Sequence, residues 1–160
     1  MTQTASKPRR WLLAVDPRVY HWDTLFVKGK EMWRHAGHKP DALRQLKQVR
    51  KGDRALCYHG KPDFALYALA EVSRDPYPDP HHPDAKHLVV DLRAVERLPR
   101  QVSLTELREN KLLRKIKFMK NTRLTIAALT DEEYTEILRM AGIVLLRESL
   151  CRNAGVPAGS

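Results

Sequence analysis

Apolar residues occur in short runs that Gly, Pro and Asp interrupt, a pattern that predicts brief strands and helices rather than long ones. Strands are expected at residues 10–15, 55–58, 64–72, 87–95 and 123–126. Helices are expected at residues 20–28, 41–49, from 103 onward, and 131–141. Because the strands do not alternate strictly with long helices, we expect an α+β fold, a curled β-sheet or small barrel decorated by short helices.

A turn followed by a strand lies near the centre of the sequence. Gly52 and Asp53 are turn residues, because Gly tolerates positive φ and Asp can bond to nearby backbone. The apolar run 55–58 that follows is bounded by Gly on both sides, as a buried strand often is. This strand would deliver two flat side chains, Tyr58 and His59, to its exit.

Local signals also mark helix ends and domain boundaries. Ser103 and Thr130 each stand three residues before a Glu, the spacing of a capping box, and Gly142 can end the last helix. The chain is expected to have three parts: a disordered lead-in at 1–9, one domain at 10–142, and a C-terminal extension at 143–160 that is helical and then frayed.

A strong positive charge narrows the choice of partners. The 160 residues carry 29 Lys and Arg against 19 Asp and Glu, a net charge of +10, which favours a polyanion such as nucleic acid. No apolar run approaches the roughly 18 residues of a membrane span, so no membrane partner is expected. Cys57 and Cys151 are expected to be reduced, which favours the cytoplasm, or the nucleus in a eukaryote.

Patterns typical of catalytic and metal sites are weak. Residues 79–87 gather three His and two Asp without a recognised zinc spacing, so a solvated, Pro-stiffened loop is the simpler interpretation. Cys57 and His59 share one face of a strand, yet no acidic residue is placed to orient the His. The sequence contains no Gly-rich phosphate loop, nucleophile elbow or zinc-protease motif. We therefore expect no catalytic residue, no metal and no cofactor.

Aromatic and basic residues interleave, a pattern typical of proteins that stack an unpaired base and hold phosphates with Lys and Arg. Trp22 falls on an apolar helix face and is interpreted as core. Trp33 falls in residues 29–40, a stretch that is predicted to be a polar loop, and is a candidate stacking surface. The candidate phosphate contacts are Arg34, Lys39, Arg44, Lys115 and Lys117.

Several short motifs follow one another in the order of a known family. They are RWLLAVDP at 10–17, YHWD at 20–23, YHG at 58–60 and KNTRLT at 120–125. In this order they resemble the EVE domain family, PUA-like barrels whose relatives include the YTH readers of methylated RNA. The resemblance extends over about residues 10–142. It departs from the family at 14–16, where Ala-Val-Asp replaces Lys-Ser-Glu, and after Trp33, where the loop sequence differs.

The resemblance implies a non-catalytic module that reads a modified base in DNA or RNA. Trp33 and Tyr58 would be facing aromatic walls, and His59 and Asn121 would meet the polar edge of the base. The full set of implied pocket residues is Trp11, Trp33, Tyr58, His59, Lys120, Asn121, Thr122 and Arg123.

Two other functions stay open at this point. The ASCH group of PUA-like folds is linked to hydrolysis of nucleosides or RNA, and Lys120 is the one candidate catalytic side chain for such a reaction. A protein–protein adaptor would instead use the apolar tail at residues 143–150.

Overall fold

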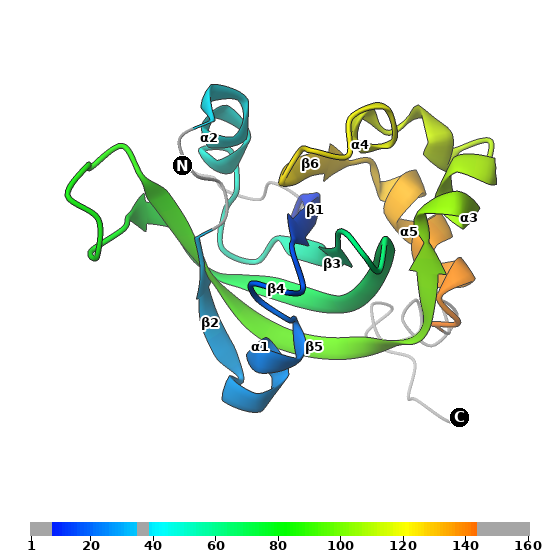
Figure 1. Cartoon of the computed structure of the whole chain (residues 1–160), viewed down its shortest axis with the longest axis horizontal. Coiled ribbons are helices and arrows are strands. Elements are labelled where there is room, and N and C mark those ends of the chain that lie inside the picture. Colours follow the sequence, from blue (N-terminus) through cyan, green and yellow to red (C-terminus); the bar gives the residue numbers. More distant parts are fainter. Residues whose placement is uncertain (1–7, 35–38, 144–160) are drawn as a thin grey trace, which may run out of the picture.

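The computed structural model of the chain describes residues 8–34 and 39–143. Figure 1 shows a strongly curved sheet with short helices around it. The strands are β1 (Arg10–Val15), β2 (Lys30–Trp33), β3 (Arg54–His59), β4 (Ala65–Pro78), β5 (Leu88–Ser103) and β6 (Ile126–Leu129). The helices are α1 (Asp23–Lys28), α2 (Pro40–Leu46), α3 (Leu104–Glu109), α4 (Lys117–Lys120) and α5 (Asp131–Met140), with a 3-10 turn at Leu113–Lys115. The predicted α+β fold, with a curled sheet decorated by short helices, is confirmed.

The strands form one sheet in the order β2-β5-β4-β3-β1-β6. β1 is parallel to β3 and antiparallel to β6, so that Leu12 lies between Leu56 and Ala127. The other neighbours are antiparallel. The runs predicted at 64–72 and 87–95 lie within β4 and β5 and are neighbouring strands, as expected.

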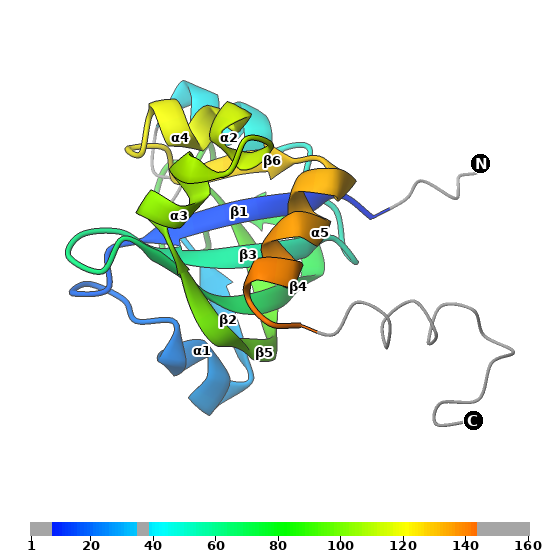
Figure 2. The same ribbon diagram turned by 90° about the vertical axis from the view of Figure 1, so that its right-hand side faces the viewer.

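Alternating side chains along the strands build a hydrophobic core on each face of the sheet. On β1, Leu12 and Ala14 join the cluster beneath α3, α4 and α5, whereas Trp11, Leu13 and Val15 join the cluster beneath α1 and α2. Figure 2 shows α5 lying across the strands of the first face.

The single core that the sequence suggested around strands 55–58, 64–72 and 87–95 is therefore divided. Leu56, Tyr58 and Leu66 share the first cluster, as expected, but Val90 belongs to the second. The sequence pattern marked Val90 as apolar but did not say which face of the curled sheet it would occupy.

Several segments differ from their sequence-based predictions. The strand expected at 123–126 begins only at Ile126 and continues to Leu129 as β6. Residues 30–33, expected in a loop, form β2, because they pair with β5 at the edge of the sheet. The strand expected at 87–95 continues as β5 to Ser103, past Pro99. The register shift between Leu66 and Ala68 leaves Pro99 without a partner in β4, so its missing N–H breaks no ladder bond.

The carboxylate of Asp53 is buried at the start of β3 and ties three segments together. It accepts hydrogen bonds from the backbone N–H of Arg9 at 2.8 Å and from the indole of Trp11 at 2.9 Å. It also accepts from the N–H of Arg50 at 2.9 Å, which closes the turn that contains Gly52, a residue with φ of +96°. The predicted turn is confirmed, and it is fastened to β1.

Of the two predicted capping boxes, the one at Thr130 and Glu133 is complete. At Ser103 only half of the box forms: its hydroxyl accepts from Glu106 N–H, but the Glu106 carboxylate bonds Arg100 instead. Gly142 follows α5 with φ of +85°. Of the predicted lead-in at 1–9 and the predicted extension at 143–160, residues 1–7 and 144–160 lie outside the described residues. Among the helices that the structure describes, none is long and apolar enough to cross a membrane.

Candidate functional site

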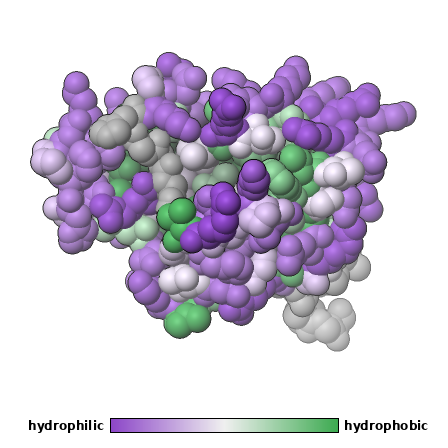
Figure 3. Space-filling model, in the orientation of Figure 1, coloured by the Kyte–Doolittle hydropathy of each residue, from purple (hydrophilic) through white to green (hydrophobic). Residues whose placement is uncertain are grey.

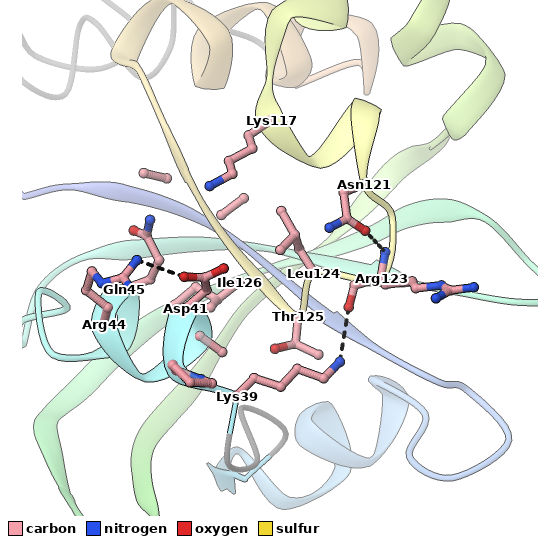
Figure 4. A pocket seen from close by; sticks show the side chains of 14 residues that line it. Lys39, Asp41, Arg44, Gln45, Lys117, Asn121, Arg123, Leu124, Thr125 and Ile126 are labelled. Atoms are coloured by element: carbon pink, nitrogen blue, oxygen red, sulfur yellow. Dashed lines mark hydrogen bonds and ion pairs between the residues drawn. The ribbon is translucent and has the colours of Figure 1, made fainter.

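A groove of about 360 Å³ runs between α2 and the chain that leads from α4 into β6 (Figure 4). α2 and the residue before it supply Lys39, Asp41 and Arg44, and the facing wall carries Lys117 and Arg123. The face of the molecule seen in Figure 3 is largely hydrophilic, with hydrophobic side chains showing between the polar ones. The groove therefore gathers cations from segments about 80 residues apart in the sequence.

Positive charge dominates the groove, which has four cationic side chains and one carboxylate in its lining. Arg44 forms an ion pair with Asp41 at 2.8 Å. The ammonium of Lys39 lies 3.5 Å from the backbone carbonyl oxygen of Arg123. Lys117 and Arg123 have no carboxylate partner within residues 8–34 and 39–143. The excess charge suits an anionic ligand.

Asn121 shapes the turn that places Arg123 at the edge of the groove. Its side-chain oxygen accepts from the N–H of Arg123 at 3.1 Å, as an Asx turn does. This bond uses the carbonyl side of the amide, and the NH₂ side remains at the groove lining (Figure 4). Asn121 thus offers a hydrogen-bond donor between the cations.

A second hollow, of about 300 Å³, lies on the other side of the segment 123–125. Its walls come from the end of β1 and the turn after it, from the turn after β3, and from Thr122. Because Arg123, Leu124 and Thr125 line both spaces, this segment is the wall between the groove and the hollow.

Tyr58 is among the residues that line the hollow, but it is almost wholly buried. Its ring meets Phe118 edge-on with the ring centres 4.8 Å apart, and the residue is only 1% exposed. Burial raises the pKa of its phenol to about 12, so the hydroxyl keeps its proton at neutral pH. Tyr58 can support the shape of the hollow, but its ring face is covered.

His59 holds the start of α1 against β3. Its Nε2 accepts a hydrogen bond of 3.0 Å from the backbone N–H of Trp22, and its Nδ1 lies 3.7 Å from an oxygen of Asp63. His21 packs against the same ring, with centres 4.3 Å apart. Burial, followed by the nearby charge of His21, lowers the pKa of His59 to about 4.

The three side chains His21, His59 and Asp63 bring their ligand atoms within 4.8 Å of one another. A metal would have to bind Nδ1 of His59, because Nε2 already accepts from Trp22. A neutral imidazole that accepts at Nε2 carries its proton on Nδ1. The geometry fits a hydrogen-bonded cluster better than a metal centre.

The buried neutral His59 makes stability depend on pH. Its pKa is about 4 in the folded protein and about 6.5 when unfolded, so the unfolded chain binds the extra proton between these values. The contribution of neutral His59 to the free energy of unfolding is complete above pH ~6.5. It falls as the pH drops toward ~4, by up to about 3 kcal/mol. Urea unfolding at several pH values should show this slope. His59→Gln, which keeps an acceptor but does not titrate, should reduce it, and an unchanged slope in the variant would contradict the assignment.

Two of the implied pocket tryptophans are core residues. Trp33 lies on β2 opposite Val90 and is 2% exposed, because strand pairing buries a residue that the sequence placed in a loop. Trp33 and Tyr58 belong to clusters on opposite faces of the sheet, so the expected facing walls do not form. Trp11 is 1% exposed and bonds to Asp53.

We expect Trp33→Ala to act on stability. Removing a buried Trp side chain costs about 3–5 kcal/mol, so the variant should melt far below the parent. Thermal melting followed by circular dichroism would measure this. Val27→Ala, at a position 83% exposed on α1, is the control that should melt with the parent. If Trp33→Ala had the same melting temperature as the parent, the assignment of Trp33 to the core would be wrong.

The remaining predicted contacts separate into two groups. Lys39, Arg44, Lys117, Asn121 and Arg123 line the groove together, and Thr122 lines the hollow.

The other basic candidates lie elsewhere. The guanidinium of Arg34 bonds the buried carboxylate of Asp79 at 2.8 Å, which gives it a structural partner. Lys115 and Lys120 are exposed but line neither space. The hydrolase alternative depended on Lys120 as its catalytic side chain, and Lys120 does not line the groove.

Among the residues that line the hollow, sequence reasoning did not single out Val19 or Lys61. Each comes from a different turn or strand end, and only the fold brings them together. The end of the predicted strand at Tyr58 could have pointed to Lys61, which follows three residues later.

A protein-family model and solved structures match most of this chain. The EVE domain model matches residues 9–140. Rpa0253 from Rhodopseudomonas palustris is 30% identical, with 85% of this chain and 94% of that chain covered and a TM-score of 0.79. Atu2648 from Agrobacterium tumefaciens is also 30% identical, with 84% and 94% covered and a TM-score of 0.80. Among curated proteins, none matches this chain.

A more distant structure shares the fold. Human THYN1, in a crystal structure of its complex with DNA containing 5-methylcytosine, is 20% identical to this chain. The likeness covers 83% of this chain and 97% of that one, with a TM-score of 0.74.

Proposed function

This chain belongs to the EVE domain family, and from that premise we propose that it is a nucleic-acid-binding module whose groove beside α2 holds the phosphate backbone. The observation that carries the proposal is the charge of the groove, where Lys39 and Lys117 extend from opposite walls, Arg123 lies at the edge, and the single carboxylate is already paired. Lys and Arg bind phosphates by displacing condensed counterions, which gives affinity without sequence preference.

The finer proposal is that a modified base is read beside these phosphates. It is supported by the fold shared with human THYN1, which was crystallised with DNA containing 5-methylcytosine. The described aromatic rings near the hollow are covered, so base recognition would rest on polar groups at the wall between groove and hollow. Asn121 and Thr122 are those groups, because both lie at this wall beside Arg123.

Salt dependence tests the phosphate groove. With about four phosphate contacts, the slope of log K against log salt should be about −3.6, a loss of roughly a hundredfold in affinity from 50 to 200 mM. Lys117→Ala should reduce the slope by about 0.9 and weaken binding to every sequence alike. Fluorescence anisotropy with a labelled oligonucleotide would measure both effects.

Lys30→Ala is the matched control for that experiment. Lys30 is an exposed lysine on β2, at the other end of the strand order from β6, and it does not line the groove. It should bind with the affinity and slope of the parent. Binding that is insensitive to salt, or equal effects of the two variants, would overturn the groove as the phosphate site.

Asn121→Ser tests base reading separately from phosphate binding. Serine can still accept from the N–H of Arg123 and keep the turn, but it removes the amide donor. One lost hydrogen bond of about 0.5–1.5 kcal/mol corresponds to about a 2- to 12-fold loss of affinity for the preferred base. Titrations with oligonucleotides that differ only in cytosine methylation should show a smaller preference in the variant and the same salt slope. A parent that binds both oligonucleotides equally would contradict modified-base reading and leave phosphate binding intact.

A further inference from the structure

An exposed valine stands at the rim of the second hollow. Val19 is 76% exposed, yet it lines this space together with Lys61 and Arg123. Single exposed apolar residues are common and need no explanation by themselves. Val27, which is 83% exposed on α1, is such a residue, since it lines neither the groove nor the hollow. The position of Val19 beside two cations is what distinguishes it.

The turn that presents Val19 is held by several bonds. The backbone carbonyl oxygen of Asp16 accepts from the N–H groups of Val19 and Tyr20, each at 2.9 Å. The carboxylate of Asp16 accepts from the backbone N–H of Arg18 at 2.8 Å and from its guanidinium at 2.9–3.0 Å. Pro17 fixes one more backbone angle. An apolar side chain on such a turn loses little freedom when a ligand packs against it.

The surroundings of Val19 indicate what it would touch. Lys61 and Arg123 have no carboxylate partner in the described part of the chain, so they can hold phosphates on either side of the hollow. A backbone held there would bring a base edge or base face to the rim. Proteins that unstack bases place apolar side chains at such points, next to the cations that hold the flanking phosphates.

We propose that Val19 is an apolar wedge, which packs against the base next to the one in the hollow and unstacks the two. The inference rests on the proposed nucleic-acid binding and adds a residue and a mechanical effect to it. The turn at 16–20 supplies the wedge, and Lys61 and Arg123 hold the strand while the base step opens. No covalent step is involved.

The test uses the full chain and two short DNA duplexes that carry 2-aminopurine beside either cytosine or 5-methylcytosine. The fluorescence of 2-aminopurine rises when it is unstacked, so the parent and Val27→Ala should both raise it on binding. Val19→Ala should bind about 3- to 10-fold more weakly, as expected for two lost methyl contacts, and lose most of the rise. Its salt slope and melting temperature should match those of the parent, because the side chain is exposed.

The outcomes separate this inference from the function on which it rests. A parent that binds with a steep salt slope but no rise in fluorescence overturns the wedge alone. A Val19→Ala protein that raises the fluorescence as the parent does also overturns it. A parent that binds neither duplex, nor RNA duplexes of the same sequence, overturns the proposed function and the wedge together.

Discussion

The buried carboxylate of Asp53 sets the position of β1 relative to β3. It accepts from the backbone before β1, from the indole of Trp11 and from the turn that leads into β3, so the two strands start at the same level. Parallel strands that start together also end together, and Val15 lies opposite His59 at the other end. The backbone N–H of Gly60 then bonds the carbonyl oxygen of Val15 at 2.8 Å. The hollow opens where these strand ends meet.

Features set by neighbouring residues were predictable from the sequence. The apolar run at residues 10–15 predicted a strand, and the spacing from Thr130 to Glu133 predicted a capped helix. The burial of Trp33 was not predictable in the same way, because it depends on pairing with Val90, nearly 60 residues further along the chain. The polar residues around Trp33 are typical of a loop, and only the pairing with β5 identifies the segment as a strand.

The same distinction applies to the charged residues of the site. Lys39, Lys117 and Arg123 were named as candidates from the sequence, and the structure places them at one groove without a carboxylate partner among the described residues. Arg34 belongs to the same kind of sequence, yet Asp79 reaches it from 45 residues away and occupies its guanidinium. A basic residue can therefore be proposed as a phosphate contact from the sequence, but the fold decides whether a carboxylate already holds it.

The wall between the groove and the hollow couples the two spaces to β1. The N–H of Ala14 donates to the carbonyl oxygen of Thr125 at 2.8 Å, and Asn121 fixes the turn that precedes this point. Because Arg123 lies between these two anchors and lines both spaces, a ligand that moved this segment would change the groove and the hollow together. In the proposed function this shared segment would link the two spaces: a phosphate that ordered Arg123 would also affect the width of the space in which a base would be read.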